Sequence, residues 1–318
     1  MLQLADIDTP TIADDEVLIR VCAAGVDPGV WHLMTGLPYL IRLFGFGLTR
    51  PKNPVPGMDV AGVVEAVGKN VTTAKPGDEV YGICKGAYAE YACAKAAKLA
   101  PKPANLTFTQ AAAVPISATT ALQALRDVAK VKPGQTVLIV GASGGVGSFA
   151  VQLAKAMGAH VTGVCSTSKL DLVRSLGADD VIDYTREDFA DGQRKFDAIL
   201  DIAGNRALSH LRRALTPRGT LVIVGGESGG RWLGGTDRQL RAMLLSLFIR
   251  QTLTSFINAE RRDDLLYLKD LLEAGRVTPV IDRTFPLSEA PDAVRHWMAG
   301  HARGKTVVTV HEPAAGPL

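Results

Sequence analysis

The chain has 318 residues, of which 47% are hydrophobic and 21% are charged, and its formal net charge is +3. This length suits two domains, and the composition is that of an ordinary globular protein. A positive charge so small and so scattered argues against nucleic acid or a membrane surface as the partner.

Cysteine usage and the apolar runs predict a cytoplasmic protein. The chain holds four irregularly placed cysteines with no CxxC pair, as in reduced cytosolic proteins: Cys22, Cys84, Cys93 and Cys165. The first residues lack a basic segment followed by an apolar core, so we expect no signal peptide. The longest apolar runs, 38–48 and 243–257, are each interrupted by an arginine and fall short of the ~20 residues of a membrane-spanning helix.

The first hundred residues predict short β-strands. Glu16–Ala23 alternates apolar and polar residues, which is the period of a strand with one buried face. Val60–Val67 and Gly86–Ala94 are two further segments of this type. Pro76–Asp78 predicts a turn before a strand at Glu79–Ile83. Short, irregular strands of this kind are typical of a partly open barrel.

Strands and helices alternate from Thr136 onward. Thr136–Val140 is a continuous apolar run, typical of a strand that is buried on both faces. The predicted strands that follow are His160–Cys165, Asp180–Ile182, Phe196–Asp201 and Gly219–Val224. The predicted helices between them are Val146–Met157, Lys169–Leu176 and Ala207–Leu215. Such alternation predicts a parallel, doubly wound sheet.

The last third of the chain predicts a glycine-rich loop, three helices and a final strand. In chain order these are the mobile loop Gly225–Gly235, the helices Leu240–Phe248, Asp263–Glu273 and Asp292–Ala299, and the strand Thr306–Val310.

The strongest functional signal is the segment Gly141–Gly147 (GASGGVG), which follows the strand Thr136–Val140 and opens the next helix. Glycine permits the positive φ of so tight a turn and lets the backbone approach a pyrophosphate. The start of the helix adds free N–H groups and a partial positive charge. We therefore predict a dinucleotide site with these cofactor-binding residues: Ser143, Gly144, Gly145 and Val146.

Two other interpretations of this segment stay open. One is a glycine turn that serves packing alone. The other is the Gly-x-Ser-x-Gly turn of α/β-hydrolases with Ser143 as nucleophile, because Asp201 and His296 or His301 follow in the matching chain order. A hydrolase turn needs neither the additional Val146-Gly147 nor a β-rich domain ahead of it, so we favour the dinucleotide.

The end of the second strand of the sheet indicates which dinucleotide binds. NAD-binding folds place a carboxylate there to hold the ribose hydroxyls. Here the strand runs into Val164–Lys169 (VCSTSK) without an acid. A carboxylate repels a 2′-phosphate, whereas Ser166, Thr167 and Lys169 suit one, so we predict NADP(H). The same three residues also suit a helix N-cap followed by a solvated lysine.

Seven motifs run along nearly the whole chain: Ala24–Pro28, Pro56–Gly62, Pro76–Val80, Ala111–Pro115, Gly141–Gly147, Leu176–Asp179 and Gly304–Lys305. Together and in this order they resemble the zinc-independent quinone oxidoreductase-like enzymes of the medium-chain dehydrogenase/reductase superfamily. The resemblance implies an α/β chain with a GroES-like β-barrel domain over residues 1–117 and 257–318. It also implies an NADP-binding Rossmann domain, a doubly wound parallel sheet, over residues 118–256. An active site between the domains and a homodimer through the nucleotide domains follow from the same resemblance.

Single residues match positions in that family's cofactor site. Lys169 matches a lysine that meets the 2′-phosphate, and Tyr184 matches a tyrosine near the same group, although a strand-end aromatic is the plainer interpretation of Tyr184. The resemblance also implies Ala203 and Gly225 at the nicotinamide end, and Lys305 among the cofactor-binding residues.

Zinc alcohol dehydrogenases are similar to this family, so a metal has to be considered. A catalytic zinc needs three protein ligands and one open position. Where those relatives carry Cys, His and Cys, this chain has Asp27, Met58 and about Ile116, and only Asp27 can ligate. The sequence therefore predicts no metal.

Without a metal, hydrogen-bond donors must polarise the substrate. This suits quinones and α,β-unsaturated carbonyls, because conjugation already lowers the barrier to hydride attack. The catalytic candidates are Asp27, His32 and Tyr39. Asp27 stands where many relatives have Asn, and it helps catalysis only if burial keeps it protonated. The plainer interpretation of Asp27 is an acid in a turn, and that of His32 is a structural histidine. Asp59 is expected to anchor the barrel by hydrogen bonds, and the apolar segment 38–48 indicates either a hydrophobic substrate or ordinary core.

The sequence thus predicts NADPH-dependent reduction of a small hydrophobic quinone or α,β-unsaturated carbonyl without zinc. The alternatives are a metal-free alcohol or ketone oxidoreductase, a non-enzymatic NADPH-binding protein and, last, the serine hydrolase.

Overall fold

The computed structural model describes residues 2–39, 42, 53–225 and 230–311. The chain divides into two compact units. The first unit comprises Met1–Thr35, Phe46–Thr119 and Ala259–Leu318, and the second comprises Gly36–Gly45 and Thr120–Asn258. The sequence placed residues 36–39 and 42 in the first domain, whereas they group with the second unit.

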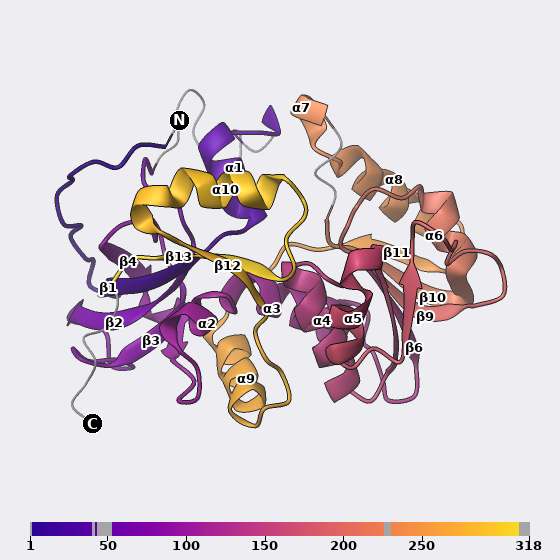
Figure 1. The fold of residues 1–318 in the computed structure, drawn as a ribbon, viewed down its shortest axis with the longest axis horizontal. Helices are drawn as coiled ribbons and strands as arrows, with labels where there is room; N and C mark the ends of the chain where they lie inside the picture. Colours follow the sequence, from indigo (N-terminus) through magenta and orange to yellow (C-terminus); the bar gives the residue numbers. More distant parts are fainter. Residues whose placement is uncertain (1, 40–41, 43–52, 226–229, 312–318) are drawn as a thin grey trace. The chain divides into compact units, whose positions relative to one another are not determined.

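The first unit is built on a seven-stranded sheet with the strand order β12-β13-β1-β2-β3-β5 and with β4 beside β1 (Figure 1). Its strands are β1 (Glu16–Gly25), β2 (Asp59–Val67), β3 (Glu79–Ile83), β4 (Tyr91–Lys95), β5 (Leu99–Pro101), β12 (Ile281–Pro286) and β13 (Lys305–Thr309). Along one edge β1 pairs with β2, and along the other it pairs first with β4 and then with β13. Register shifts at Leu18/Ile19 and Val21/Ala23 bend β1, so that one strand serves both halves of a barrel.

Apolar side chains from this sheet fill the core of the first unit. Val17, Ile19 and Val21 of β1 are completely buried and pack with Val60 of β2 and Val308 of β13. The helices of this unit are α1 (Pro28–Thr35), α2 (Phe108–Ala112), the start of α3 (Pro115–Gln123), α9 (Arg262–Glu273) and α10 (Ala290–Met298). Short 3₁₀ turns lie at η2 (Ala96–Lys98) and η5 (Leu287–Glu289).

The second unit is a six-stranded sheet in which every neighbouring pair is parallel. Its strands, in the spatial order β11-β10-β9-β6-β7-β8, are β11 (Thr252–Ser255), β10 (Leu215–Ile223), β9 (Phe196–Asp201), β6 (Thr136–Val140), β7 (His160–Cys165) and β8 (Asp180–Asp183). The chain enters at β6 in the middle, runs outward to β8 and then returns to fill the other half. This is the strand order of doubly wound dinucleotide-binding folds.

Helices cover the sheet of the second unit (Figure 1). They are α4 (Gly145–Ala156), η4 (Thr167–Lys169), α5 (Leu170–Ser175), α6 (Leu208–Ala214), α7 (Gly230–Leu233) and α8 (Thr236–Ser246), with a π-helical turn, η3 (Ala124–Val128), after α3. Val137–Val140 of β6 are at most 3% exposed, which explains why this strand is apolar on both faces. The doubly wound parallel sheet and the barrel-like sheet are both confirmed.

Several local predictions were wrong. Gly86–Glu90 is not strand, because Gly86 and Ala87 donate their N–H groups to the carbonyl of Gly57 and hold a turn. The predicted loop Gly225–Gly235 contains a helical turn, α7, because the segment Arg231–Leu233 between its glycines has no glycine of its own. Residues 226–229 fall outside the described part of the chain. Helix α8 begins four residues before its predicted start, and α1, β11 and β12 were not predicted.

Gly147 is the glycine of the loop with the least space. A Cβ placed there would lie 2.1 Å from the carbonyl oxygen of Gly141. We expect Gly147→Ala to destabilise the fold by about 2 kcal/mol, or roughly 5 °C in Tm, because the strand-to-helix turn must shift to admit the methyl group. Differential scanning calorimetry measures this.

Gly144→Ala is the matched control, because its Cβ would meet only the Gly141 oxygen at 3.6 Å and φ there is −84°. The two variants melting at the same temperature would contradict the assignment of Gly147 to packing.

Candidate functional site

The glycine loop of the second unit leaves backbone donors free at the start of α4. The first helical bond of α4 runs from the N–H of Ser148 to the carbonyl of Gly144, 2.9 Å away. The N–H groups of Gly145, Val146 and Gly147 precede that bond, so the helix offers them no acceptor four residues back. No side chain caps this end of the helix, and a Cβ at Gly144 would meet open space apart from one oxygen. This fits a diphosphate, which needs bare N–H groups and room for its oxygens.

Ser143 of the same loop is buried, with 6% of its surface exposed. The loop is held from below by the carbonyl of Val164 on β7, which accepts the N–H groups of Gly141 and Ala142 at 3.1 Å. Strand β7 therefore fixes the turn from which α4 starts.

Two further loops follow strands at the same carboxyl edge of the sheet. The carbonyl of Val140 accepts the N–H of Ile202 and of Ala203 at 3.0 and 3.1 Å. The carbonyl of Asp201 accepts the N–H of Gly225 at 3.2 Å. A side chain at Gly225 would lie 2.0 Å from the Ile202 oxygen, so the loops after β9 and β10 are in close contact. Ala203 and Gly225 thus lie together at the edge where parallel sheets bind ligands.

A buried ion pair fixes this edge, and the sequence reasoning missed it. The Asp201 carboxylate is completely buried, bonds Nη2 of Arg238 on α8 and accepts the N–H of Gly204 at 3.2 Å. The same Nη2 donates to the carbonyl of Arg206 at 2.8 Å. Burial raises the pKa of Asp201 above its usual value, while Arg238 opposes that effect. Arg238 follows a glycine-rich segment and carries no sequence signal of a contact with β9.

The residues predicted to select NADP(H) lie where β7 and β8 end. Cys165 and Asp183 are register partners at the last rung of the two strands. Ser166, Thr167 and Lys169 follow Cys165 directly, in and before the short η4 turn. Tyr184 follows Asp183, and its ring is 48% exposed, with the Arg206 guanidinium 5.7 Å above the ring centre.

Asp183 is an acid that the sequence reasoning overlooked at this position. Its carboxylate accepts the hydroxyl of Thr167 and both the hydroxyl and the N–H of Thr185, and these bonds lower the pKa of Asp183. The hydroxyl proton of Thr167 therefore points to Asp183. Its place directly after the predicted strand Asp180–Ile182 was the signal that could have found it.

A pocket of about 320 Å³ opens beside these residues. It is lined by Tyr184, Thr185, Arg186, Glu187, Asp188, Phe189, Arg206 and His210. Two arginines and a tyrosine thus border a hollow next to the end of β8.

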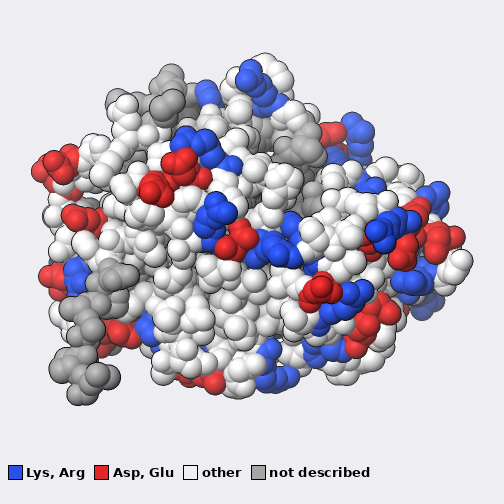
Figure 2. Space-filling view, in the orientation of Figure 1, with Lys and Arg blue, Asp and Glu red and all other residues white. Residues whose placement is uncertain are grey.

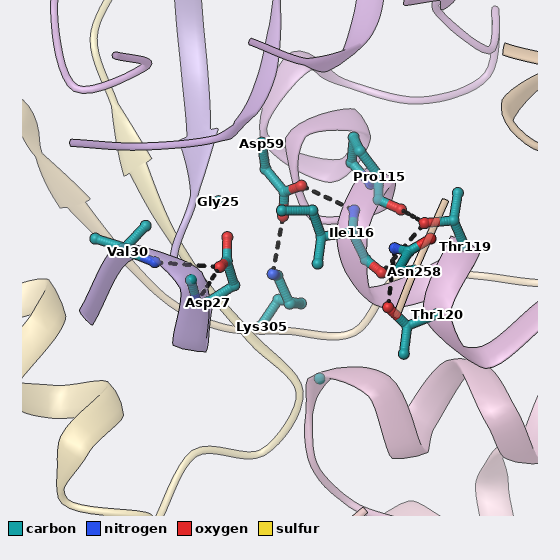
Figure 3. Close-up of polar contacts among 12 residues, drawn as sticks. Gly25, Asp27, Val30, Asp59, Pro115, Ile116, Thr119, Thr120, Asn258 and Lys305 are labelled. Atoms are coloured by element: carbon teal, nitrogen blue, oxygen red, sulfur yellow. Dashed lines mark hydrogen bonds and ion pairs between the residues drawn. The ribbon is translucent and has the colours of Figure 1, made fainter. Parts of the chain in front are cut away.

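A cluster of three ionisable side chains is buried in the first unit (Figure 3). Asp59 accepts the Ile116 N–H at 2.8 Å with one oxygen and the Lys305 ammonium at 3.0 Å with the other. Asp59 and Lys305 are 0% and 3% exposed. The prediction that Asp59 anchors the barrel by hydrogen bonds is confirmed. The ammonium of Lys305 lies in this ion pair, and its predicted contact with a cofactor stays a prediction.

Asp27 is the third member of this cluster. One carboxylate oxygen accepts the N–H of Gly29 at 2.7 Å and of Val30 at 3.3 Å, so Asp27 caps α1, while its other oxygen, Oδ2, is buried without a partner. Burial and the neighbouring Asp59 raise the pKa of Asp27 to about 7, against the opposing effects of Lys305 and the two N–H donors. Asp27 thus retains its proton close to neutral pH, which is the condition that sequence analysis set for a catalytic role.

Two of the three catalytic candidates, Asp27 and His32, lie in the first unit, and the third, Tyr39, lies in the second. His32 lies on α1 five residues after Asp27, which is about 140° further around the helix. Its ring meets that of Trp31, with centroids 5.1 Å apart. Tyr39 belongs to the second unit, where its ring contacts Trp232.

The described residues can be compared with a metal centre and with the catalytic triad of a hydrolase. Among the described residues, no group of three His, Cys, Asp or Glu side chains could hold a metal ion. For a hydrolase, Asp201 would have to orient a histidine, but its carboxylate is bonded to Arg238 and Gly204. His296 is bonded to Asp282 instead.

Positive and negative side chains are interspersed over the face in Figure 2, with no expanse of one sign. In the part of the chain that the structure describes, no helix is long and apolar enough to cross a membrane.

Comparison with known proteins agrees with this architecture. Residues 13–104 match the alcohol dehydrogenase GroES-like domain, and residues 176–308 match the family described as zinc-binding dehydrogenase. The mouse mitochondrial NAD(P)H oxidoreductase RTN4IP1 is 36% identical over 332 residues, which cover 93% of this chain and 82% of that protein.

Solved structures are similar over almost the whole chain. The quinone oxidoreductase from Coxiella burnetii superposes with a TM-score of 0.85 at 30% identity and covers 97% of this chain and 95% of its own. The mycobacterial protein Rv1454c, solved in complex with NADPH, gives a TM-score of 0.80 at 28% identity over 96% of this chain and 94% of its own.

A GroES-like unit joined to a dinucleotide-binding sheet defines a nicotinamide-dependent oxidoreductase. The chain belongs to the medium-chain dehydrogenase/reductase superfamily, and its relatives there include quinone oxidoreductases.

The raised pKa of Asp27 predicts how stability depends on pH. Because its pKa is higher in the folded chain than in the unfolded chain, the stability linked to its proton is complete below about pH 4 and is lost as pH rises toward 7. The groups facing it are Asp59, Lys305 and Tyr88. We expect the stability of Asp27→Asn relative to wild type to increase by about 2 to 3 kcal/mol between pH 5 and pH 8.

Urea unfolding of both proteins at several pH values measures this difference. Asp183→Asn serves as the control, because the pKa of Asp183 is lowered and its difference from wild type should be nearly constant over the same range. Parallel stability profiles for wild type and Asp27→Asn would contradict the assignment of a buried proton to Asp27.

Proposed function

We propose that this oxidoreductase reduces small hydrophobic quinones and α,β-unsaturated carbonyls with NADPH and without zinc. The observation that carries the proposal is the row of free N–H groups at Gly145, Val146 and Gly147 above a glycine that leaves room for a diphosphate. The quinone oxidoreductase and the NADPH complex among the similar structures support the choice of substrate and cofactor. All four cysteines are free, which supports a cytoplasmic location.

The preference for NADPH rests on the residues after β7 and β8. No acid follows Cys165, and Lys169 supplies a positive charge within the same turn. The nearby Asp183 carboxylate accepts the hydroxyls of Thr167 and Thr185, so these bonds direct its oxygens toward the two threonines. In this proposal Ser166, Lys169 and Tyr184 hold the 2′-phosphate, and the Arg206 guanidinium over the Tyr184 ring adds a further positive charge.

The nicotinamide of the bound cofactor supplies the hydride, and the chain supplies position and proton control. Ala203 and Gly225 border the place of that ring at the carboxyl edge of the sheet. Backbone hydrogen bonds fix the loops after β9 and β10 that carry them. Asp27 carries the proton that offsets negative charge developing on the substrate oxygen, and it can do so because burial and Asp59 raise its pKa to about 7, so that a large share of the carboxyl carries a proton near neutral pH. His32 is a second donor. In this proposal Lys305 acts through its ion pair with Asp59.

An assay of purified protein tests the proposal directly. We expect oxidation of NADPH, followed at 340 nm, with 1,4-naphthoquinone and with but-3-en-2-one, and little with simple alcohols or saturated ketones. Activity should survive treatment with a zinc chelator. Tight NADPH binding without turnover of any acceptor would contradict the proposal and favour a binding protein, and turnover of saturated ketones alone would favour the alcohol or ketone enzyme.

Lys169→Ala separates the two dinucleotides in the same assay. Loss of one charge-assisted phosphate contact should raise KM for NADPH about tenfold and leave KM for NADH unchanged. The control is Lys132→Ala, since Lys132 is exposed ahead of β6, at the amino edge of the sheet.

A second copy of the chain is proposed to pair with this one through the second unit. Five exposed apolar side chains follow one face of α8 and the turn after it: Leu240, Met243, Leu244, Leu247 and Phe248. Leu247 and Phe248 are 77% and 84% exposed. They precede β11, which pairs with β10 and ends the strand order of the sheet. An unpaired strand edge beside an apolar stripe is self-complementary about a two-fold axis, because each copy offers both halves of the contact.

Phe248→Asp should convert the dimer to a monomer, because a carboxylate placed in this apolar stripe would be buried without a partner. Multi-angle light scattering should give twice the chain mass of 33.7 kDa for the wild type and the single mass for the variant. Leu4→Asp, at a residue that is 70% exposed in the first unit, should leave the dimer intact. A monomeric wild-type protein would sink the proposal.

A further inference from the structure

Two segments far apart in the sequence meet at a pair of aromatic rings in the second unit. The ring of Tyr39 contacts that of Trp232 on α7, with centroids 5.2 Å apart and planes inclined at 71°. Edge-to-face pairs of this kind are a favourable arrangement of aromatic rings. Neither Trp232 nor the contact was found by sequence reasoning, because 193 positions separate the two residues along the chain (232 − 39).

Two contacts within the segment that carries Tyr39, and one contact with the residue after α7, fix the position of this segment. The guanidinium of Arg42 lies 4.8 Å from the centre of the Tyr39 ring, and its Nε donates to the carbonyl of Gly36 at 2.9 Å. Pro38 is buried against Gly234, where a Cβ would come within 2.5 Å of the proline ring. Only glycine at 234 permits this contact. The Tyr39 ring is therefore held by its own segment as well as by its contact with Trp232.

Trp232 is nevertheless 75% exposed. Burying an indole ring is among the largest apolar gains a single residue offers, so a ring that is fixed in place and left uncovered marks a surface for a partner molecule. The inclined rings form a corner, in which a flat molecule can stack on the indole face while its edge meets Tyr39. The Arg42 charge beside Tyr39 adds attraction for the oxygen of such a molecule.

The position of α7 in the chain connects this corner with the proposed chemistry. Helix α7 begins five residues after Gly225 (230 − 225), which lies at the carboxyl edge of the sheet in contact with the loop after β9. Quinones fused to further aromatic rings are flat and electron-poor, which complements the electron-rich face of indole. Small open-chain enones offer no ring to stack.

We propose that Trp232 and Tyr39 form a stacking subsite that selects flat, polycyclic aromatic quinones over open-chain α,β-unsaturated carbonyls. This inference rests on the proposed function and adds a substrate class to it. It assigns Trp232 to binding, and it gives Tyr39 a place in a ring pair in addition to its candidate catalytic role.

Substrate selectivity tests the subsite. The ratio of kcat/KM for 9,10-phenanthrenequinone to that for but-3-en-2-one should fall about tenfold in Trp232→Ala and recover most of its wild-type value in Trp232→Phe, which keeps a ring. Leu233→Ala is the matched control, because Leu233 is 45% exposed on the same short helix and has no ring; its ratio should stay within twofold of wild type. An unchanged ratio in Trp232→Ala, or an equal fall in Leu233→Ala, would overturn the proposal.

Calorimetric titration with 9,10-phenanthrenequinone makes the subsite testable apart from turnover. Wild type should bind the quinone, and Trp232→Ala should bind it about tenfold more weakly with the same melting temperature as wild type. Equal affinity for both proteins, or no binding by wild type, would refute the subsite even if NADPH oxidation is found. If the quinone binds through Trp232 but no acceptor is reduced, the subsite stands and the proposed reaction fails. A change of oligomeric state in Trp232→Ala would assign the ring to a contact between copies and overturn the proposal.

Discussion

The contact between the backbone of Gly147 and the carbonyl oxygen of Gly141 is the constraint from which the second unit's chemistry follows. It lets α4 start directly beneath the end of β6, so that the helix's unsatisfied N–H groups emerge at the carboxyl edge of the sheet. Any side chain at 147 would push the helix away from the strand. The neighbouring Gly144 has space around it, so the same short loop combines one glycine needed for packing with one that leaves room for phosphate.

The buried acids of the two units are stabilised in different ways. In the first unit, Asp59 and Lys305 form an ion pair, and Asp27 beside them has a buried oxygen without a partner, so its carboxyl keeps a proton to near neutral pH. In the second unit, Asp201 is neutralised by Arg238, and its backbone carbonyl holds Gly225. One unit thus offers a proton, and the other offers a rigid edge. The proposed reduction of a conjugated carbonyl would use both features.

Local sequence patterns predicted much of this fold because the patterns reflect local physics. The continuous apolar run of β6 and the alternation of strands and helices predicted β6, β7 and β9 with their observed bounds, and the glycine loop was placed correctly between β6 and α4. What the sequence could not give is contact between distant residues. Asp201 with Arg238 and Tyr39 with Trp232 depend on how the chain folds back on itself, and no spacing rule connects them. The raised pKa of Asp27 is of the same kind, since it depends on burial in the folded unit and on the neighbouring Asp59. Helix α7 was not predicted because the glycines on either side of Arg231–Leu233 are typical of a loop.

Isothermal titration calorimetry of NADPH against wild type and Gly144→Val tests the central claim most directly. The valine side chain would fill the open space above Gly144 without touching the core contact at Gly147. The account predicts saturable binding to the wild-type chain and a loss of at least tenfold in affinity in the variant, with both proteins folded. Equal affinity for the two proteins, or no heat of binding to the wild-type chain, would contradict it.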